Sequence, residues 1–168
     1  MDYFIRNFQP DDWPSVWQIL RATFAAGDTY TMAPDISEEE THKIWIESPL
    51  VTYVACFGEG NIVGTYKLLA NQPGSGSHVC NCGYVVSPAA RGKGIASMMC
   101  EHSQAEALRL GFRAMQFNMV VVTNLAAVHL WKKHGFQIVG TLPKAFRHRQ
   151  LGYVDAHVMF KRLTNGSD

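Results

Sequence analysis

The fold of this chain is decided by one stretch, Tyr84-Val85-Val86-Ser87-Pro88-Ala89-Ala90-Arg91-Gly92-Lys93-Gly94-Ile95-Ala96. Its composition predicts an apolar strand, then a short turn, a loop with two glycines, and a helix. This order places unpaired backbone N–H groups at the positive end of a helix, where an anion binds. The stretch therefore indicates a ligand that carries phosphate.

Length and composition limit what the rest of the chain can be. Its 168 residues suit a single domain spanning residues 1–168, and the formal net charge is only +1. That balance argues against a dedicated nucleic-acid binder, which would carry an excess of basic residues. The N-terminus lacks an apolar signal segment, and no apolar run approaches the length of a membrane span. We expect a cytoplasmic protein without membrane contact.

The cysteine and histidine spacings do not indicate a metal site. The four cysteines, Cys56, Cys80, Cys82 and Cys100, form no CxxC pair. Cys80 and Cys82 alternate along a predicted strand, so both side chains point to one face and a disulfide between them is disfavoured. His129 and His134 are five apart on a predicted helix and do not share a face. We expect reduced core thiols and no metal.

Strands and helices alternate along the chain. Strands are predicted over 3–8, 51–57, 62–70, 79–86, 114–122, 136–140 and 153–161, and helices over 11–25, 37–47, 92–110 and 124–134. Asp11 and Asp12 supply an acidic N-cap for the first helix, and Ser37 with Glu40 forms a capping box for the second. The pattern predicts an α/β or α+β fold with a mixed sheet.

Two common phosphate-binding motifs do not fit the glycine loop. A Walker A motif requires Ser or Thr after the lysine, whereas Gly94 follows Lys93. A dinucleotide fingerprint requires a third glycine, where Ser97 stands, and an acidic residue about twenty positions further on. A plain strand-to-helix turn explains one or two glycines, but it explains less well why Arg91 and Lys93 accompany them.

The loop and a second segment resemble one family. Arg91-Gly92-Lys93-Gly94-Ile95-Ala96 is similar to the R/Q-x-x-G-x-G/A signature of the GCN5-related N-acetyltransferases (GNAT). Downstream, the segment from Asn124 to Phe136 resembles the family's N-x-x-A-x-x-L-Y-x-x-x-G-F segment. Because both segments occur in the family's order, with a strand between them, the resemblance is specific. It implies a mixed central sheet of about six to seven strands with helices on both faces.

The resemblance implies acetyl-coenzyme A (acetyl-CoA) as the acetyl donor. Its pyrophosphate would lie on the backbone amides from Gly92 to Ala96, and its pantetheine arm between strands 79–86 and 114–122. Asn124 matches a family asparagine that contacts this arm, and it could cap the following helix at the same time. The residues expected to bind the cofactor are Val86, Ser87, Arg91, Gly92, Lys93, Gly94, Ile95, Ala96 and Asn124.

One position departs from the family. The frequent tyrosine that acts as general acid falls at Trp131, and an indole N–H does not deliver a proton at useful pH. A thiol has a pKa of about 8.5, so a thiolate is a tolerable leaving group without an acid. The departure therefore bears on the mechanism and not on cofactor binding.

Asparagines mark the candidate acceptor site. Asn81 and Asn118 interrupt apolar strands, so each is either satisfied within the fold or available to a substrate. With Asn124 they resemble a branch of fungal N-acetyltransferases that act on L-azetidine-2-carboxylate and other proline-like imino acids. In that branch, asparagines bind substrate and stabilise the thioester oxygen. We therefore expect Asn118 and Asn124 to be catalytic, and Asn81 and Asn118 to bind substrate. Tyr30 is also expected to bind substrate, because it lies in the loop between the first two predicted helices, which in the resembled family often covers the acceptor site.

Three functions stay open. The first is an enzyme that acetylates the amine of a small molecule, such as an amino acid or imino acid, by direct attack in a ternary complex. The second is a catalytically silent acyl-CoA sensor, which Trp131 permits. The third is an acetyltransferase for peptide or protein N-termini. Edge strands near the C-terminus make a homodimer an expectation by family habit.

Overall fold

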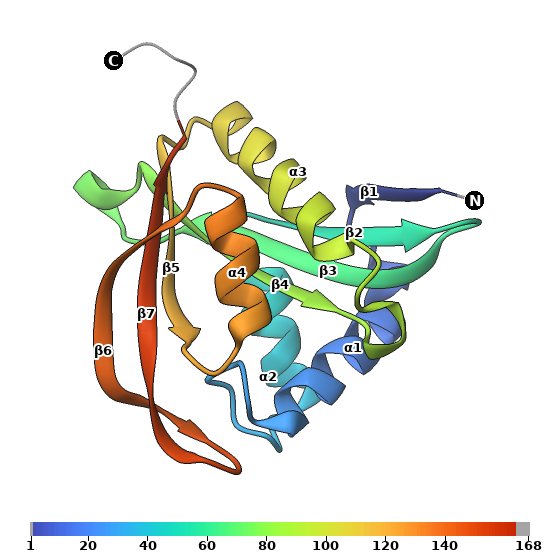
Figure 1. The fold of residues 1–168 in the computed structure, drawn as a ribbon. Coiled ribbons are helices and arrows are strands. Elements are labelled where there is room, and N and C mark those ends of the chain that lie inside the picture. The colour runs from blue at the N-terminus through green and yellow to red at the C-terminus, as the bar shows by residue number, and fades with distance from the viewer. Residues whose placement is uncertain (1, 164–168) are drawn as a thin grey trace.

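The computed structural model describes residues 2–163, which form one seven-stranded mixed sheet with four α-helices on its two faces (Figure 1). The strands are β1 (Tyr3–Asn7), β2 (Val51–Phe57), β3 (Asn61–Ala70), β4 (Val79–Val86), β5 (Ala114–Val121), β6 (Gln137–His148) and β7 (Gly152–Arg162). The helices are α1 (Trp13–Ala26), α2 (Glu38–His42), α3 (Ile95–Arg109) and α4 (Leu125–Lys133). The predicted fold class is confirmed.

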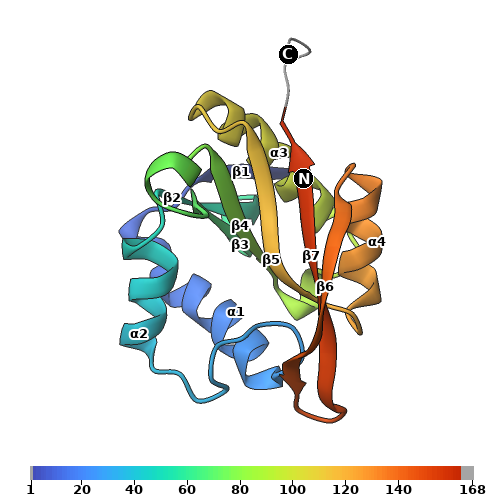
Figure 2. The same ribbon diagram turned by 90° about the vertical axis from the view of Figure 1, so that its left-hand side faces the viewer.

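The sheet changes direction at its centre. Its strand order is β1-β2-β3-β4-β5-β7-β6, and β4 and β5 are the parallel neighbours among otherwise antiparallel pairs. Their ladder holds two register pairs, Val79 with Ala114 and Cys80 with Met115. Beyond these pairs the two strands draw apart (Figure 2). The sheet is therefore open between β4 and β5, close to the loop singled out above.

Each face of the sheet buries its own apolar cluster. Helices α1 and α2 cover one face, where Leu20 and Phe24 of α1 pack with Trp45, which follows α2. Helices α3 and α4 cover the opposite face, where Met99 of α3 and Trp131 of α4 join the larger cluster (Figures 1 and 2). A ligand that passes between β4 and β5 would thus meet both layers of helices.

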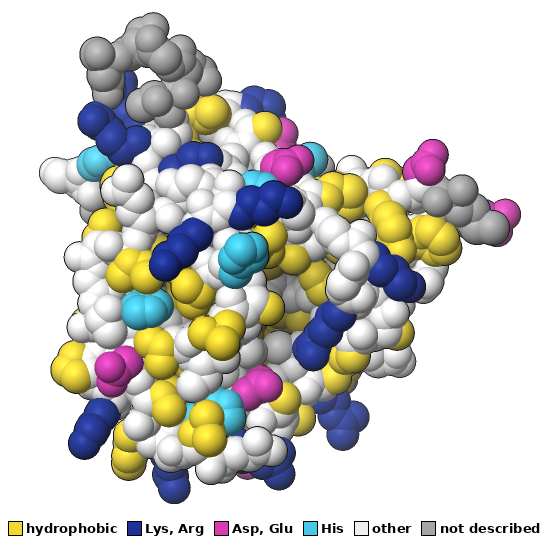
Figure 3. Space-filling view, in the orientation of Figure 1, with side chains coloured by type: hydrophobic (Ala, Val, Ile, Leu, Met, Phe, Trp, Pro, Cys, Tyr) yellow, Lys and Arg dark blue, Asp and Glu magenta, His cyan; other side chains and the backbone are white. Residues whose placement is uncertain are grey.

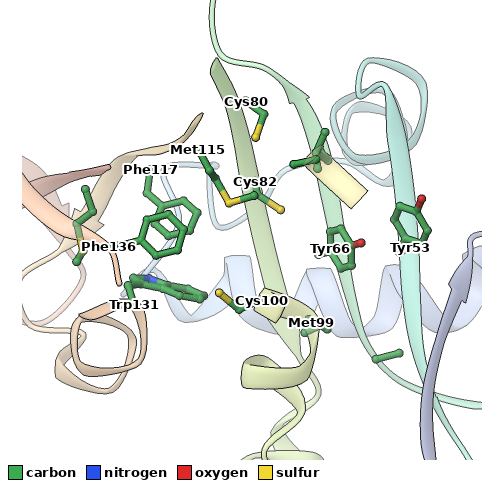
Figure 4. Close-up of a cluster of buried hydrophobic side chains, with 14 of the residues drawn as sticks. Tyr53, Tyr66, Cys80, Cys82, Met99, Cys100, Met115, Phe117, Trp131 and Phe136 are labelled. Atoms are coloured by element: carbon green, nitrogen blue, oxygen red, sulfur yellow. The ribbon is translucent and has the colours of Figure 1, made fainter. Parts of the chain in front are cut away.

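The larger cluster contains three of the four cysteines. Cys80, Cys82 and Cys100 lie among the core side chains (Figure 4), and all four cysteines are free and buried. Burial raises the pKa of the Cys80 and Cys100 thiols to about 12, so both stay neutral near pH 7. The predicted reduced core thiols are confirmed.

Helix α3 begins later than predicted. The sequence indicated a helix from Gly92, but α3 starts at Ile95 because Gly92 and Gly94 take positive φ angles of 75° and 79°. The second helix is also modified, since a π-helical turn at Lys43–Glu47 continues α2. Within residues 2–163, no helix is long and apolar enough to span a membrane.

Strand β6 is longer than predicted. It continues to His148 instead of ending at Gly140, and it pairs with β7 through register shifts between Ile138 and Gly140 and between Leu142 and Phe146. The second shift accommodates Pro143, which lacks a backbone donor, and Lys144, whose φ is 51°. A proline is tolerated here because β6 is the edge strand of the sheet.

The sequence predicted that the side chain of Asp12 caps α1, but the structure shows no such cap. Asp12 occupies the N-cap position, but no hydrogen bond from its side chain caps the helix. Its carboxylate instead accepts two bonds from the Arg6 guanidinium, at 2.7 and 2.8 Å, and one from the Gln9 N–H. These contacts tie the start of α1 to β1. The predicted capping box of Ser37 and Glu40 is confirmed.

Candidate active site

A cavity of about 560 Å³ lies where β4 and β5 separate. Its walls come from both faces of the sheet: the loop between α1 and α2 contributes to one side, and α3 and α4 contribute to the other. The lining residues include Asp28, Tyr30, Lys67, Asn81, Gly83, Tyr84, Val86, Arg91, Ala96, Phe117, Asn118, Met119, Asn124, Leu130 and Trp131. Two ligands that enter from opposite faces could therefore meet within the sheet.

Asn81 sits at the point where the strands part. Its Nδ2 donates to the main-chain carbonyl of Gln116 on β5 at 3.0 Å, one residue beyond the last ladder pair. A side chain thus replaces the backbone donor that a regular parallel ladder would supply. Asn81 lines the cavity as predicted, and its amide nitrogen is engaged within the fold.

The glycine loop presents bare backbone amides. The first backbone bond of α3 runs from the Met98 N–H to the Gly94 carbonyl, and the structure pairs none of the N–H groups from Gly92 to Ala96 with another group in residues 2–163. A Cβ at Gly92 or Gly94 would meet nothing within 4 Å. Glycine is needed at both positions for its positive φ and not for lack of space.

The predicted cofactor residues divide by position. Val86, Arg91, Ala96 and Asn124 line the cavity. Ser87 and residues 92–95 are outside its lining, and Ile95 is buried, so its backbone N–H is the group that it could offer. The face that carries α3 and α4 shows Lys and Arg side chains scattered among uncharged, acidic and histidine side chains (Figure 3). This face therefore presents no continuous basic stripe.

Asn124 caps α4. Its side chain accepts a hydrogen bond from the Ala127 N–H at 3.3 Å, so the residue has the N-cap role that the sequence allowed. The residue also lines the cavity, so its amide group borders the space between β5 and α4. The two roles are compatible, because the cap uses Oδ1 and not Nδ2.

Asn118 is exposed and does not interrupt a buried core. The pairing of β5 with β7 shifts between Phe117 and Val120, which leaves Asn118 and Met119 in a bulge. Its Oδ1 accepts from the Gln116 side chain at 2.9 Å, and its Nδ2 donates to Oδ1 of Asn71 at 2.7 Å. Bulges recur beside active sites because they redirect a side chain, and this one lies at the cavity.

Tyr30 closes the cavity from the loop between α1 and α2. Its hydroxyl donates to the main-chain carbonyl of Tyr84 at 2.9 Å, and its ring packs on Phe24 and Trp45. Burial raises the pKa of the Tyr30 hydroxyl well above its usual range, so it acts as a donor and not as an anion. Gly83 leaves room for this bond, because a Cβ there would lie 3.2 Å from the Tyr30 oxygen, which is tighter than an ordinary contact.

Trp131 occupies the position of the family tyrosine. It is only 8% exposed, and its ring centroid lies 4.9 Å from that of Tyr84 and 4.8 Å from that of Phe117. Figure 4 shows Trp131 beside Phe117. The nearby Tyr84 hydroxyl shares a 2.7 Å hydrogen bond with Ser103, and burial raises its pKa well above the usual range. Neither aromatic side chain is therefore suited to donate a proton near pH 7.

Three polar residues of this region were missed from the sequence. Asn71 and Gln116 hold Asn118, and Lys67 lines the cavity from β3. Lys67 stands between Tyr66 and Leu68, two fully buried residues, so it interrupts an apolar strand as Asn81 does. A search for polar residues within apolar strands would therefore also have identified Lys67. Asn71 lies in a loop where asparagine is ordinary, and its local sequence gives no signal.

Comparison with known proteins identifies the family. Residues 13–136 match the acetyltransferase (GNAT) family. The chain belongs to this family. A GCN5-related N-acetyltransferase from Kribbella flavida superposes with a TM-score of 0.91 and 38% identity, over 95% of this chain and 97% of that one. These matches confirm the predicted GNAT N-acetyltransferase assignment and the fold that it implies.

More distant relatives bear specific names. N-acetyltransferase aca1 of Schizosaccharomyces pombe is 36% identical over 99 residues, which cover 58% of this GNAT chain and 47% of that protein. The match thus spans less than half of the yeast protein. The L-amino acid N-acetyltransferase AaaT of Escherichia coli is 28% identical over 161 residues, covering 92% and 94% of the two chains. The narrower proline-analogue branch and the homodimer stay predictions.

Proposed function

We propose that this GNAT protein transfers the acetyl group of acetyl-CoA to the amine of a small molecule. The observation that carries the proposal is the single cavity between β4 and β5, which is lined from both faces of the sheet. Arg91 and Ala96, at the two ends of the glycine loop, line it on the side of α3, and polar side chains line it on the side of α1. Donor and acceptor can then be bound together, as direct attack in a ternary complex requires.

The residues of the loop suit acetyl-CoA. Its free N–H groups at the start of α3 and the adjacent Arg91 and Lys93 match a pyrophosphate in charge and hydrogen bonding. Beyond Cys80 and Met115, the edges of β4 and β5 that face each other do not pair with a strand. Their backbone groups can therefore bond to the amides of the extended pantetheine arm. Two structures of this fold, from Sinorhizobium meliloti and Salmonella typhimurium, contain acetyl-CoA, at 21% and 17% identity.

The acceptor amine must also lose a proton before it can attack. Acetyl-CoA supplies a thioester carbonyl that a neutral amine can attack. An amine with a pKa of about 10.4 is neutral in only about one molecule in 2,500 at pH 7. The site therefore has to favour the neutral amine and orient it. Asn81, Asn118 and Tyr30 would position the acceptor, and the amides of Asn118 and Asn124 would stabilise charge on the thioester oxygen.

Trp131 favours one alternative, a non-catalytic acyl-CoA sensor. Removal of a general acid typically costs about 10²–10⁴-fold in rate, which is a handicap and not a block when the leaving group is a thiolate. The cavity also has polar side chains on the α1 side of the sheet, where an acceptor would bind, and this supports the enzyme. A sensor needs the donor side alone.

Thiol release separates these functions. The protein is incubated with acetyl-CoA and, in separate reactions, with amino acids, imino acids, polyamines and a peptide with a free N-terminus. Free thiol above the background without amine supports the enzyme, and the acceptor that produces it shows the class. Saturable acetyl-CoA binding with no acceptor-dependent release across the whole panel supports the sensor instead. Release with the peptide alone supports N-terminal acetylation.

A further inference from the structure

Lys67 places a positive charge on the acceptor side of the cavity. It lies on β3, opposite Gly83 of β4, and lines the cavity. Its Nζ donates to the Ile44 carbonyl at 3.0 Å and lies 5.1 Å from the centre of the Trp45 ring. The side chain passes Gly83, where a Cβ would lie 3.7 Å from Lys67 Cε. Trp45 belongs to the cluster under α1, so the ammonium is on the side of the sheet opposite Trp131.

This ammonium has no counter-charge within the fold. Among residues 2–163 no carboxylate lies within 4.0 Å of Lys67, although Asp28 lines the same cavity. The side chain is half-buried, and burial lowers the pKa of its ammonium. An ammonium has three N–H donors, and one is used on Ile44. A partly buried cation that is unpaired is costly unless a ligand completes its contacts.

We propose that Lys67 binds a carboxylate of the acceptor, so that the substrate is an amino acid or imino acid and not a simple amine. This inference rests on the proposed function and narrows it. The neighbours of Lys67 are suited to the rest of such a molecule, because Tyr30 reaches the same glycine and Asn81 borders the opening toward β5. A carboxylate on Lys67 would leave the attached amine near the gap in the sheet.

The other basic side chains nearby are less suited to this role. Arg91 belongs to the glycine loop, on the donor side. Arg147 and Arg149 line a neighbouring hollow of about 480 Å³ between the loop before α2 and the end of β6, which shares Tyr30, Thr31 and Met32 with the cavity. Arg149 already donates to the Ala25 carbonyl at 2.8 Å, and Arg147 is exposed to solvent, where a single ion pair binds weakly. Arg147 is therefore the comparison variant for the test.

Matched acceptor pairs test the inference in the full chain. Rates are measured with L-proline against pyrrolidine and with L-alanine against ethylamine, for wild type, Lys67→Met, Lys67→Arg, Arg147→Met and Lys43→Met. Lys43 is an exposed lysine paired with Glu39, away from the cavity, and serves as control. We expect wild type to prefer the carboxylate-bearing member of a pair at least tenfold. Lys67→Met should raise the KM for that acceptor at least tenfold and remove the preference, while the KM for acetyl-CoA stays within about twofold.

The outcomes separate this inference from the proposed function. Equal rates for both members of each pair in wild type would overturn the role of Lys67 and leave the acetyltransferase in place, as would a loss of preference in Arg147→Met alone. Partial recovery in Lys67→Arg supports the role. If no acceptor is turned over, calorimetry with L-proline and with pyrrolidine in the presence of coenzyme A decides it. Binding of L-proline that Lys67→Met abolishes supports the carboxylate site, and absence of L-proline binding to wild type overturns it.

Discussion

The side chain of Asn81 joins β4 to the main-chain carbonyl of Gln116 on β5, at 3.0 Å and one residue past the last ladder pair. A backbone N–H would hold two parallel strands at about 4.8 Å, whereas a side chain spans a wider separation. The bond therefore fixes the point at which the sheet begins to open. Because the cavity starts there, the width of the gap is set by Asn81 as well as by the strands.

Replacement of Asn81 by alanine tests this relationship. We expect the free energy of unfolding to fall by about 1–2 kcal/mol, because the Gln116 carbonyl loses its donor. Acetyl-CoA affinity should fall severalfold, since the gap loses its brace. Urea unfolding and calorimetric titration measure the two effects. Asn71→Ala is the matched control, because Asn71 contacts the exposed Asn118 and should cost less than about 0.5 kcal/mol. Unchanged stability in Asn81→Ala would show that its bond to Gln116 does not brace the two strands.

Replacement of Asn118 by alanine should separate turnover from cofactor binding. Asn118 is exposed and its partners are side chains, so we expect stability to change by less than about 0.5 kcal/mol. The rate of acetyl transfer should fall much more than the affinity for acetyl-CoA. Steady-state kinetics and titration of acetyl-CoA make the comparison. An equal loss of both, or a loss of folding, would show that Asn118 is not part of the acceptor site.

Some local features of the fold could be predicted from the sequence, and features set by strand pairing could not. The capping box of Ser37 and Glu40 depends on neighbouring residues, so the residue types reveal it. The positive φ of Gly92 and Gly94, which delays the start of α3 to Ile95, was not predicted. The extension of β6 past Gly140 depends on pairing with β7, which overrides the turn tendency of Pro143. Periodicity does not show that kind of pairing.

In the candidate site, too, some residues could be predicted from the sequence and others could not. The asparagines were found because polar residues stand out in apolar strands, and the structure places both Asn81 and Asn118 at the cavity. Their partners were not found. The bond from Asn81 to Gln116 joins residues 35 apart, and the bond from Asn118 to Asn71 joins residues 47 apart. The two-pair ladder of β4 and β5, which makes the cavity, is likewise a consequence of the whole sheet.

Substitutions of Gly94 in the glycine loop should differ in their effects according to backbone strain. Gly94 has a φ of 79°, and a Cβ there would meet no atom within 4 Å, so the penalty for another residue is backbone strain alone. We expect Gly94→Ala to cost about 1 kcal/mol of stability and to weaken acetyl-CoA binding. Gly94→Asn should cost less, because asparagine adopts this conformation more readily. Calorimetry and thermal unfolding compare the variants. Identical behaviour of the alanine and asparagine variants would exclude strain as the cause.

Buried acids predict a loss of stability at alkaline pH. Burial raises the pKa of the Cys80 and Cys100 thiols from 9.0 to about 12. The unfolded chain loses these protons first, so the stabilising contribution is complete below pH 9 and is lost as the pH rises toward 12. We expect the urea midpoint to fall progressively from about pH 9, and less steeply in a Cys80→Ala, Cys100→Ala double variant. A midpoint that is constant to pH 11 would contradict this.

Tyr30 and Gly83 give paired variants that act on one hydrogen bond. Tyr30→Phe removes the hydroxyl that donates to the Tyr84 carbonyl, and keeps the ring that packs on Phe24 and Trp45. Gly83→Ala keeps the hydroxyl but places a methyl group 3.2 Å from it, so the tyrosine oxygen has to move by a few tenths of an ångström and its bond is weakened. Each variant should lower the free energy of unfolding by about 1 kcal/mol.

The double variant Tyr30→Phe, Gly83→Ala measures the coupling between the two residues. Because both changes act on the same bond, their effects on unfolding and on the KM of the acceptor should not add. Urea unfolding and kinetics with saturating acetyl-CoA measure the coupling in the single and double variants. Full additivity would mean that Gly83 acts through another contact, such as the Lys67 side chain that also passes it. In that case the two single variants would differ in their selectivity between L-proline and pyrrolidine, because only a shift of Lys67 would weaken the preference for the carboxylate.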